Sequence, residues 1–257
     1  MKKLFLVVLA MFSLVVCSQT KEKKTDLQKE NLKGKVKSVR ETSYKAVEKF
    51  GQIEKGGILF ESFSNYLVLY NEQGNQIELN SYNSAGSLDY KLTYKYDEQG
   101  NKIEQNWYSD GSLKWRDTYK YDKQGNQIEE NIYNSDGSLI GKLTYKYDEQ
   151  GNLIEENNYK SDENLNRKWT YKYDEQGNLI ELNDYNSAGS LDDKWTYKYD
   201  EQGKKIEENW YKSDGSFFSR YTYKYKKYDK QGNWIERIVY RDGEPAYIAE
   251  REIEYYK

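Results

Sequence analysis

Hydrophobic and polar residues alternate along most of this chain in a pattern that returns about every 26 residues. In TYKYDEQGNLIE, at Thr144–Glu155, tyrosines alternate with Thr, Lys and Asp, the period of a β-strand with two unlike faces. The Asp-Glu-Gln-Gly-Asn stretch is typical of a tight turn, because Gly tolerates a positive φ and Asp and Asn bond to nearby backbone. A second strand is expected over Leu153–Tyr159, so the unit is predicted to be a β-hairpin.

This unit recurs about seven times. Its turn glycines follow one another at spacings of 26, 25, 26, 26, 26 and 29 residues, at Gly74, Gly100, Gly125, Gly151, Gly177, Gly203 and Gly232. A fixed period indicates one supersecondary unit copied in series. We therefore predict an all-β fold, an elongated, curved antiparallel sheet of about seven 26-residue two-strand repeats. Because strand twist accumulates, this sheet is expected to coil toward an open barrel or spiral shell.

Side-chain chemistry predicts the register of each hairpin. An even-numbered turn pairs Tyr147 with Ile154 and Lys146 with Glu155, so that apolar residues meet and opposite charges meet. Ile154 and Tyr159 are five residues apart, an odd spacing that leaves two alternatives: a β-bulge in the second strand, or tyrosines on both faces of the sheet. The predicted Lys–Glu column comprises Lys95/Glu104, Lys120/Glu129, Lys146/Glu155, Lys172/Glu181 and Lys198/Glu207.

The N-terminus indicates an export signal. Residues 1–16 combine two lysines with an apolar run that is too short for a comfortable transmembrane helix. The single cysteine, Cys17, follows directly in a sequence that resembles a bacterial lipobox, although Val16 stands where a smaller residue is usual. We expect cleavage before Cys17 and its lipidation, with ordinary signal cleavage after Ser18 as the alternative. The polar residues 17–35 are predicted to form the lipidated N-terminus and a flexible tether.

The remaining chain divides into three predicted regions. Residues 36–65 are expected to cap the array, with a short helix or a loop at residues 45–57. Residues 66–236 hold the repeats, and residues 237–257 form C-terminal capping strands. The last of these, Tyr247–Tyr256, is rich in charge and follows Pro245, which is typical of an edge strand protected against further pairing.

Composition narrows the functional classes. The chain has 28 Tyr against 7 Phe. Charged residues of both signs make up 32% of it and the net charge is −3, so we expect no basic stripe that could bind nucleic acid. It has no histidine, which removes the commonest general base and metal ligand. The predicted Lys–Glu column accounts for the recurring glutamates without a catalytic role. We therefore expect no enzyme activity, no cofactor and no metal.

Candidate binding residues are those that break the repeat. Trp169 and Trp195 occupy the position of Leu143, Trp107 and Trp210 occupy that of Ile132, and Trp115 lies near a return turn. Tryptophans on a hydroxyl- and amide-rich sheet can stack on sugar rings or anchor a protein partner. The plainer interpretation is that they are large residues that cover one face of the sheet.

The recurring Tyr-x-Tyr-Asp-x-x-Gly-Asn, as in Tyr96–Asn101 and Tyr173–Asn178, resembles the YD repeats of bacterial RHS proteins. The resemblance covers roughly residues 66–236 and implies a spiralling β-sheet shell. The repeat of this chain differs from the YD repeat in two ways: its period is longer, and Asn or Lys follows the turn glycine where Arg is usual. MORN-type repeats are a looser analogy.

Three functions compete. The first is a non-catalytic lipoprotein of the bacterial cell envelope that binds an envelope protein or glycan, or that serves as a structural surface. This protein would be extracytoplasmic and lipid-anchored. After ordinary signal cleavage it would instead be secreted or periplasmic. The second, implied by the resemblance, is an immunity or accessory protein of an RHS-like toxin system. The third is a carbohydrate-active enzyme.

Overall fold

The computed structural model describes residues 24–59, 65–83 and 85–257, which form one short helix and a single antiparallel sheet of 17 strands. The helix is α1 (Asp26–Lys29). The strands are β1 (Val36–Lys49), β2 (Gln52–Ile58), β3 (Asn65–Tyr70), β4 (Gln76–Tyr82), β5 (Leu88–Tyr96), β6 (Lys102–Ser109), β7 (Ser112–Tyr121), β8 (Gln127–Asn134), β9 (Leu139–Tyr147), β10 (Leu153–Lys160), β11 (Leu165–Tyr173), β12 (Leu179–Asn186), β13 (Leu191–Tyr199), β14 (Lys205–Lys212), β15 (Phe217–Tyr228), β16 (Trp234–Arg241) and β17 (Glu244–Tyr255).

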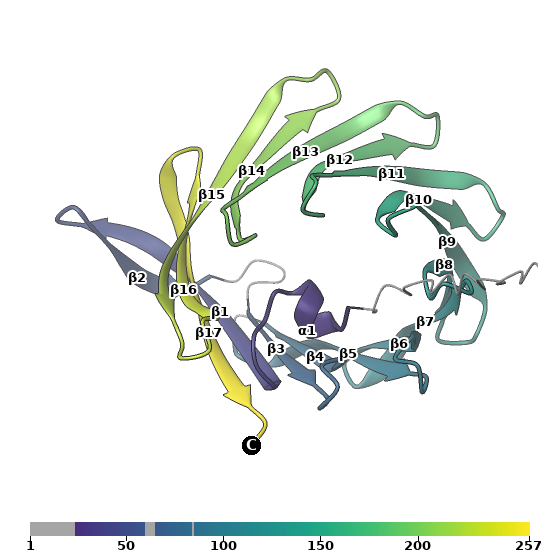
Figure 1. Ribbon diagram of the computed structural model, residues 1–257, viewed down its shortest axis with the longest axis horizontal. Coiled ribbons are helices and arrows are strands. Elements are labelled where there is room, and N and C mark those ends of the chain that lie inside the picture. The colour runs from purple at the N-terminus through teal and green to yellow at the C-terminus, as the bar shows by residue number, and fades with distance from the viewer. Residues whose placement is uncertain (1–23, 60–64, 84) are drawn as a thin grey trace, which may run out of the picture.

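The sheet closes into a barrel. Consecutive strands pair from β3 to β17, and β1 pairs with β3 on one side and with β17 on the other, so sixteen strands form a ring (Figure 1). The all-β prediction is confirmed, and the expected open, elongated sheet is replaced by a closed one. The prediction of an edge strand at Tyr247–Tyr256 is wrong, because Ile253 of β17 lies opposite Val39 of β1. Closure gives β17 a second partner.

The hairpin turns follow the sequence prediction, with one correction to the register. Gly151 has a φ of 77° and its N–H donates to the Asp148 carbonyl at 3.0 Å. Lys146 lies opposite Glu155 as predicted, but Tyr147 lies opposite Leu153 and not Ile154. Ile154 is the extra residue of a β-bulge, and equivalent register shifts occur in the neighbouring hairpins.

The helix α1 identifies the inner face of the barrel. It lies inside the ring of strands (Figure 1), and the Tyr96 hydroxyl donates to Asp26 of α1 at 2.8 Å. The tyrosines of each Tyr-x-Tyr therefore face the interior. Lys142 and Lys146 alternate with the inward-facing tyrosines of β9, so they face outward. Because directly paired residues share a face, Tyr159, opposite Lys142, and Glu155, opposite Lys146, face outward as well. Both open alternatives hold: the strand is bulged, and tyrosines cover both faces.

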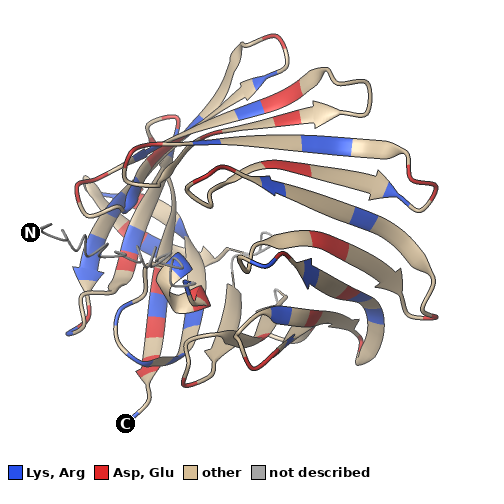
Figure 2. Ribbon diagram, turned by 45° about the vertical axis from the view of Figure 1, so that its right-hand side comes forward, with Lys and Arg blue, Asp and Glu red and all other residues tan. Residues whose placement is uncertain are grey.

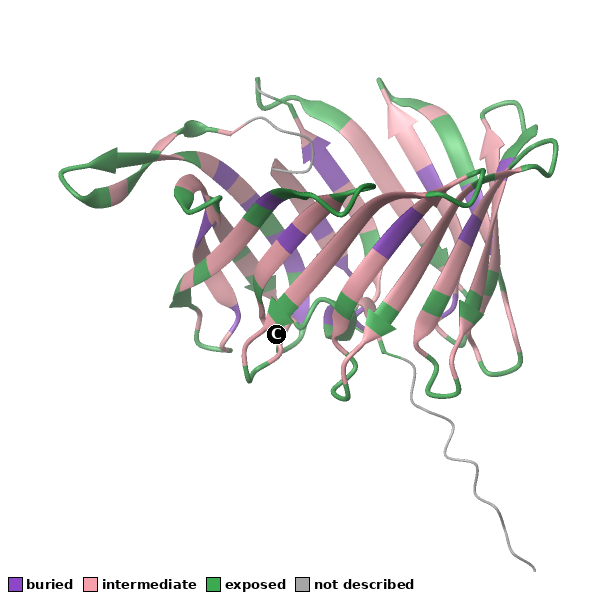
Figure 3. Ribbon diagram, turned by 90° about the horizontal axis from the view of Figure 1, so that it is seen from above, coloured by how far each residue is buried: buried purple, intermediate pink, exposed green. Residues whose placement is uncertain are grey.

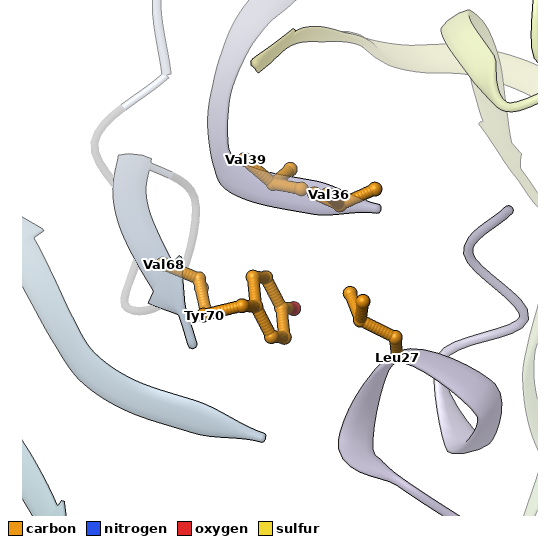
Figure 4. Packing of buried hydrophobic residues seen from close by; sticks show 5 residues of the cluster. All are labelled: Leu27, Val36, Val39, Val68 and Tyr70. Atoms are coloured by element: carbon orange, nitrogen blue, oxygen red, sulfur yellow. The ribbon is translucent and has the colours of Figure 1, made fainter. Parts of the chain in front are cut away.

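The N-terminal segment differs from the expected flexible tether. Thr25 caps α1, and Leu27, only 7% exposed, donates its backbone N–H to Gly74 at 3.0 Å. Leu27 packs with Val68 and Tyr70 inside the barrel (Figure 4). The burial of Leu27 and the backbone bond fix this segment at the end of the barrel that carries the Gln-Gly-Asn turns. Residues 1–23, which include the predicted signal and Cys17, lie outside the described residues.

The first and second strands form an arm that leaves the barrel. Residues 45–57, expected to be a helix or a loop, belong to the hairpin of β1 and β2, in which Lys49 lies opposite Gln52 (Figure 1). The side chain of Phe50 at its tip is fully exposed. The arm extends from the end opposite α1, because β1 begins near Leu69 and runs toward the return turns.

Most side chains of the strands are half-buried, and fully buried ones form short patches (Figure 3). Val36, Val239 and Ala249 are among the few fully buried apolar residues, and they lie on β1, β16 and β17 respectively. The described residues thus form no thick apolar core. The barrel is held by its strand ladder and by polar and aromatic side chains on both faces.

Candidate ligand-binding interior

All five tryptophans singled out by the sequence face the interior. Trp169 and Trp195 lie two residues before the inward-facing Tyr171 and Tyr197, and Trp107 lies opposite Leu92, which is two residues before Tyr94. Trp115 is paired with Trp107, and Trp210 is paired with Trp195. They sit toward the return-turn end, opposite the end that holds α1. A period-2 strand brings such residues to one face, and closure makes that face the concave one.

Trp107 and Trp115 form the first aromatic group, on β6 and β7. Their ring centroids are 4.3 Å apart with an interplanar angle of 66°, so the rings pack edge to face. Tyr90 lies 5.3 Å from Trp107 at 52°. Trp115 is 37% exposed, so this group is accessible from the interior.

Trp195 and Trp210 form the second group, on β13 and β14. Their rings are 5.8 Å apart and nearly parallel at 21°, and Phe218 lies 4.2 Å from Trp210. The Trp210 indole N–H donates to Asp193 at 2.7 Å, which fixes the orientation of that ring. In Figure 1 the strands of this group lie across the ring from β6 and β7. The two aromatic groups therefore line different walls of the barrel.

Tyrosine–carboxylate pairs cover the middle of the inner face. The hydroxyls of Tyr145 and Tyr171 donate to Glu130 at 2.6 Å and Glu156 at 2.9 Å. Burial and then the Glu130 charge raise the pKa of Tyr145, because a phenolate beside a carboxylate is unfavourable. Burial also raises the pKa of Glu156. These hydroxyls consequently remain proton donors at all ordinary pH values.

Asp117 is the most perturbed carboxyl on the inner face. Burial, and then the negative charge of Glu130, raise its pKa to about 6. Gln105 donates to it at 2.8 Å. Lys102 lies 4.4 Å from the Tyr119 ring, and burial lowers the pKa of this amine. Asp117 stands where the other repeats have Leu, Trp or Tyr, so it is a further departure from the repeat on this face.

A buried ion group joins the strands at the seam where the barrel closes. Glu41 of β1 accepts from Arg251 of β17 at 2.8 Å and from the Tyr66 hydroxyl of β3 at 2.8 Å. Arg237 of β16 approaches the other carboxylate oxygen at 3.5 Å. Both guanidinium groups also lie over the Trp234 ring, Arg251 at 3.7 Å and Arg237 at 4.3 Å. The Glu41 carboxylate thus joins side chains of β3, β16 and β17 to β1.

The outer face carries the predicted charge ladder. The five Lys–Glu pairs of the column are formed at 2.5–2.7 Å, and Lys227–Glu236 adds a sixth at 2.6 Å. Hydrogen bonds from Lys146, Lys168 and Asn157 lower the pKa of Glu155 to about 2. Charges of both signs alternate along the strands (Figure 2). The outer face thus combines this ladder of charged side chains with outward-facing tyrosines such as Tyr159.

Sequence reasoning missed the acidic side chains that accompany the second aromatic group. Asp184 is 3% exposed, and Arg167 donates to it at 2.8 Å and to Asp192 at 3.3 Å. The sequence did contain a signal for them, because in the other repeats no acidic residue stands at the positions of Asp184 and Asp193. In residues 24–59, 65–83 and 85–257, no three His, Cys, Asp or Glu side chains are grouped so that they could hold a metal ion.

Comparison of the sequence with known families and curated proteins gives a single partial match. One family model, described as an uncharacterised protein, matches residues 112–172. The curated proteins contain no significant match. None of the helices among the described residues is long and apolar enough to cross a membrane.

Structural comparison supports the barrel fold. A porin-like protein from Bacteroides uniformis superposes with a TM-score of 0.55 and 12% identity, over 85% of this chain and 98% of that chain. The TcdB2-TccC3-Cdc42 complex matches at a TM-score of 0.34 and 15% identity, over 84% of this chain and 12% of that chain. The Tc holotoxin pore of Photorhabdus luminescens matches at 0.34 and 16%, over 80% and 12%. The chain spans nearly the whole porin-like protein and about one eighth of the toxin chains, and it shares a β-barrel fold with the former.

Proposed function

We propose that this protein is a non-catalytic binding module of the bacterial cell envelope that holds a glycan inside its barrel. The observation that carries the proposal is the placement of the repeat-breaking tryptophans. Trp107, Trp115, Trp169, Trp195 and Trp210 come from five strands, and all face the interior toward one mouth. Sugar rings present C–H groups to aromatic faces and hydroxyls to carboxylates and amides, and the inner face offers both.

The ladder of Lys–Glu pairs on the outer face supports a barrel that is tethered to a membrane and not embedded in one. Cys17 is the proposed anchor, and the chain advances by eight residues from Cys17 to Thr25, the N-cap of α1. Eight residues reach about 26–29 Å when fully extended. Since α1 lies at the end with the Gln-Gly-Asn turns, this end faces the membrane in the proposal. The tryptophan-lined mouth then points away from it, toward envelope glycans.

The test is a glycan array probed with the mature, detergent-solubilised protein, starting at Cys17. The wild type should retain glycans, and Trp107→Ala combined with Trp210→Ala should lose them. Phe50→Ala is the matched control, because it removes an exposed aromatic ring at the tip of the arm and leaves the interior unchanged. Retention of glycans by the double variant, or capture of proteins but no glycans, contradicts the proposal.

The anchor is tested separately by mass spectrometry of the mature N-terminus. An acylated Cys17 is the expected result. A chain that begins at Gln19 without modification refutes the lipid anchor and favours a secreted or periplasmic protein.

A further inference from the structure

One wall of the interior combines flat aromatic rings with fixed charged groups. We define the aromatic–acidic wall as Trp169, Asp184, Asp193, Trp195, Trp210 and Arg167, which lie on β11 to β14. In the strand register Trp169 is opposite Asp184, Asp184 is opposite Asp193, and Trp195 is opposite Trp210. These directly paired side chains are neighbours on the same face of the sheet. The wall therefore brings three indole rings and two carboxylates together over four adjacent strands.

The rings of this wall are held as a platform. Trp195 and Trp210 are stacked and nearly parallel at 21°, and Trp210 is fixed by its hydrogen bond to Asp193 and by contact with the Phe218 ring at 4.2 Å. Both indoles are half-buried, so they keep surface toward the interior. The negative π-face of a fixed indole attracts the slightly positive C–H face of a pyranose ring.

The carboxylates of the wall are fixed as well. Asp184 is buried and ion-paired with Arg167, which also binds Asp192. Asn186 donates to Asp192 at 3.0 Å. Asp193 uses Oδ1 for the Trp210 N–H, and a carboxylate has further lone pairs that can accept hydrogen bonds from sugar hydroxyls. Preorganised acceptors beside a ring platform lose little conformational entropy on binding.

We propose that the aromatic–acidic wall is a subsite for one pyranose ring of a neutral or amino-bearing glycan. This inference rests on the proposed function and adds the site and the chemical class. Three carboxylates (Asp184, Asp192, Asp193) are accompanied by Arg167 and by Lys212, whose amine lies 5.2 Å from the Phe218 ring. The excess of negative charge repels sugars that carry carboxylate, sulfate or phosphate groups.

The opposite wall provides an internal comparison. Trp107 and Trp115 pack edge to face at 66°, so they present no common plane to a sugar ring. The ring next to Trp107 is Tyr90, and the carboxyl of this wall is Asp117, two residues after Trp115, which accepts a hydrogen bond from Gln105. Trp115→Ala is therefore the comparison variant for Trp195→Ala, because each removes one inward-facing indole and only the second removes a ring of the nearly parallel pair. Phe50→Ala, at the exposed tip of the arm, is the control that leaves the interior unchanged.

The experiment is isothermal titration of the full mature chain with three oligosaccharide probes of equal length. Mannan-derived fragments are neutral, chitosan fragments carry amines and polygalacturonate fragments carry carboxylates. Wild type should bind the first two and bind the third at least about tenfold more weakly. Trp195→Ala should weaken binding about tenfold, Trp115→Ala should weaken it less than Trp195→Ala does, and Phe50→Ala should leave it unchanged. Asp193→Asn should reduce the discrimination against polygalacturonate.

Two further arms keep the test decisive. Trp195→Phe retains an aromatic ring and should keep most of the wild-type affinity. This variant takes the place of Trp195→Ala if Trp195→Ala does not fold. Binding that is lost in Trp115→Ala and kept in Trp195→Ala overturns this subsite and leaves the proposed function intact. Preference for polygalacturonate overturns the assigned chemical class. Absence of binding to all three probes and to the glycan array overturns both the inference and the proposed function.

Discussion

Replacing Glu41 by leucine should lower the free energy of unfolding by about 3–5 kcal/mol, because it removes the partner of two buried cations. Glu41 is 5% exposed, and it accepts from Arg251 and Tyr66 at 2.8 Å each. Charge-assisted hydrogen bonds contribute about 1.5–3 kcal/mol each, and the unpaired Arg251 would add a desolvation cost. The site lies on β1, whose pairings with β3 and β17 close the ring.

A double-mutant cycle separates the lost pair from the lost volume. Glu41→Leu combined with Arg251→Met replaces the pair by apolar side chains, and it should cost at least about 1 kcal/mol less than the sum of the two single changes. Urea unfolding followed by tryptophan fluorescence gives each free energy by linear extrapolation. Lys146→Ala, on the exposed ladder, is the control. If Glu41→Leu alone costs less than about 1 kcal/mol, the seam is not held by this group and the reasoning fails.

Three further predictions concern other parts of the barrel. Because the pKa of Asp117 is raised to about 6, the folded barrel binds this proton more tightly than the unfolded chain, so the group lowers stability as pH rises from about 4 to about 6. Asp117→Asn should gain stability relative to the wild type over that pH window, and a constant difference in urea titrations would contradict the assignment. Leu27→Ala should cost about 2–3 kcal/mol, because it empties the contact between α1 and Tyr70; thermal unfolding that matches the wild type would show that α1 does not hold this end. Lys146→Ala should change stability by only about 0.2–1 kcal/mol, measured by the same unfolding titration, since its side chain is exposed; a loss above 2 kcal/mol would mean that the ladder does more than set register.

The local structure of this chain was accessible from the sequence because it depends on near neighbours. The period-2 alternation of Thr144–Tyr147, the turn chemistry of Asp148 and Gly151 and the charge match of Lys146 with Glu155 predicted strands, turns and most of the register. The bulge at Ile154 was left as one of two alternatives, since an odd spacing alone does not distinguish a bulge from a two-faced strand. Trp195 and Trp210 were identified as candidates only because they break a repeat.

Closure, and with it the candidate site, was decided by tertiary structure. Alternation tells which residues share a face, but not which face is concave, because that depends on twist accumulated over sixteen strands. The pairing of Val39 with Ile253 joins residues more than 200 positions apart, and no local pattern specifies it. Once β1 closes the ring, tryptophans from separate hairpins and the unpredicted Asp184 and Asp193 face one interior. The sequence by itself determined the hairpin, and the closed barrel decided which of its two faces could surround a ligand.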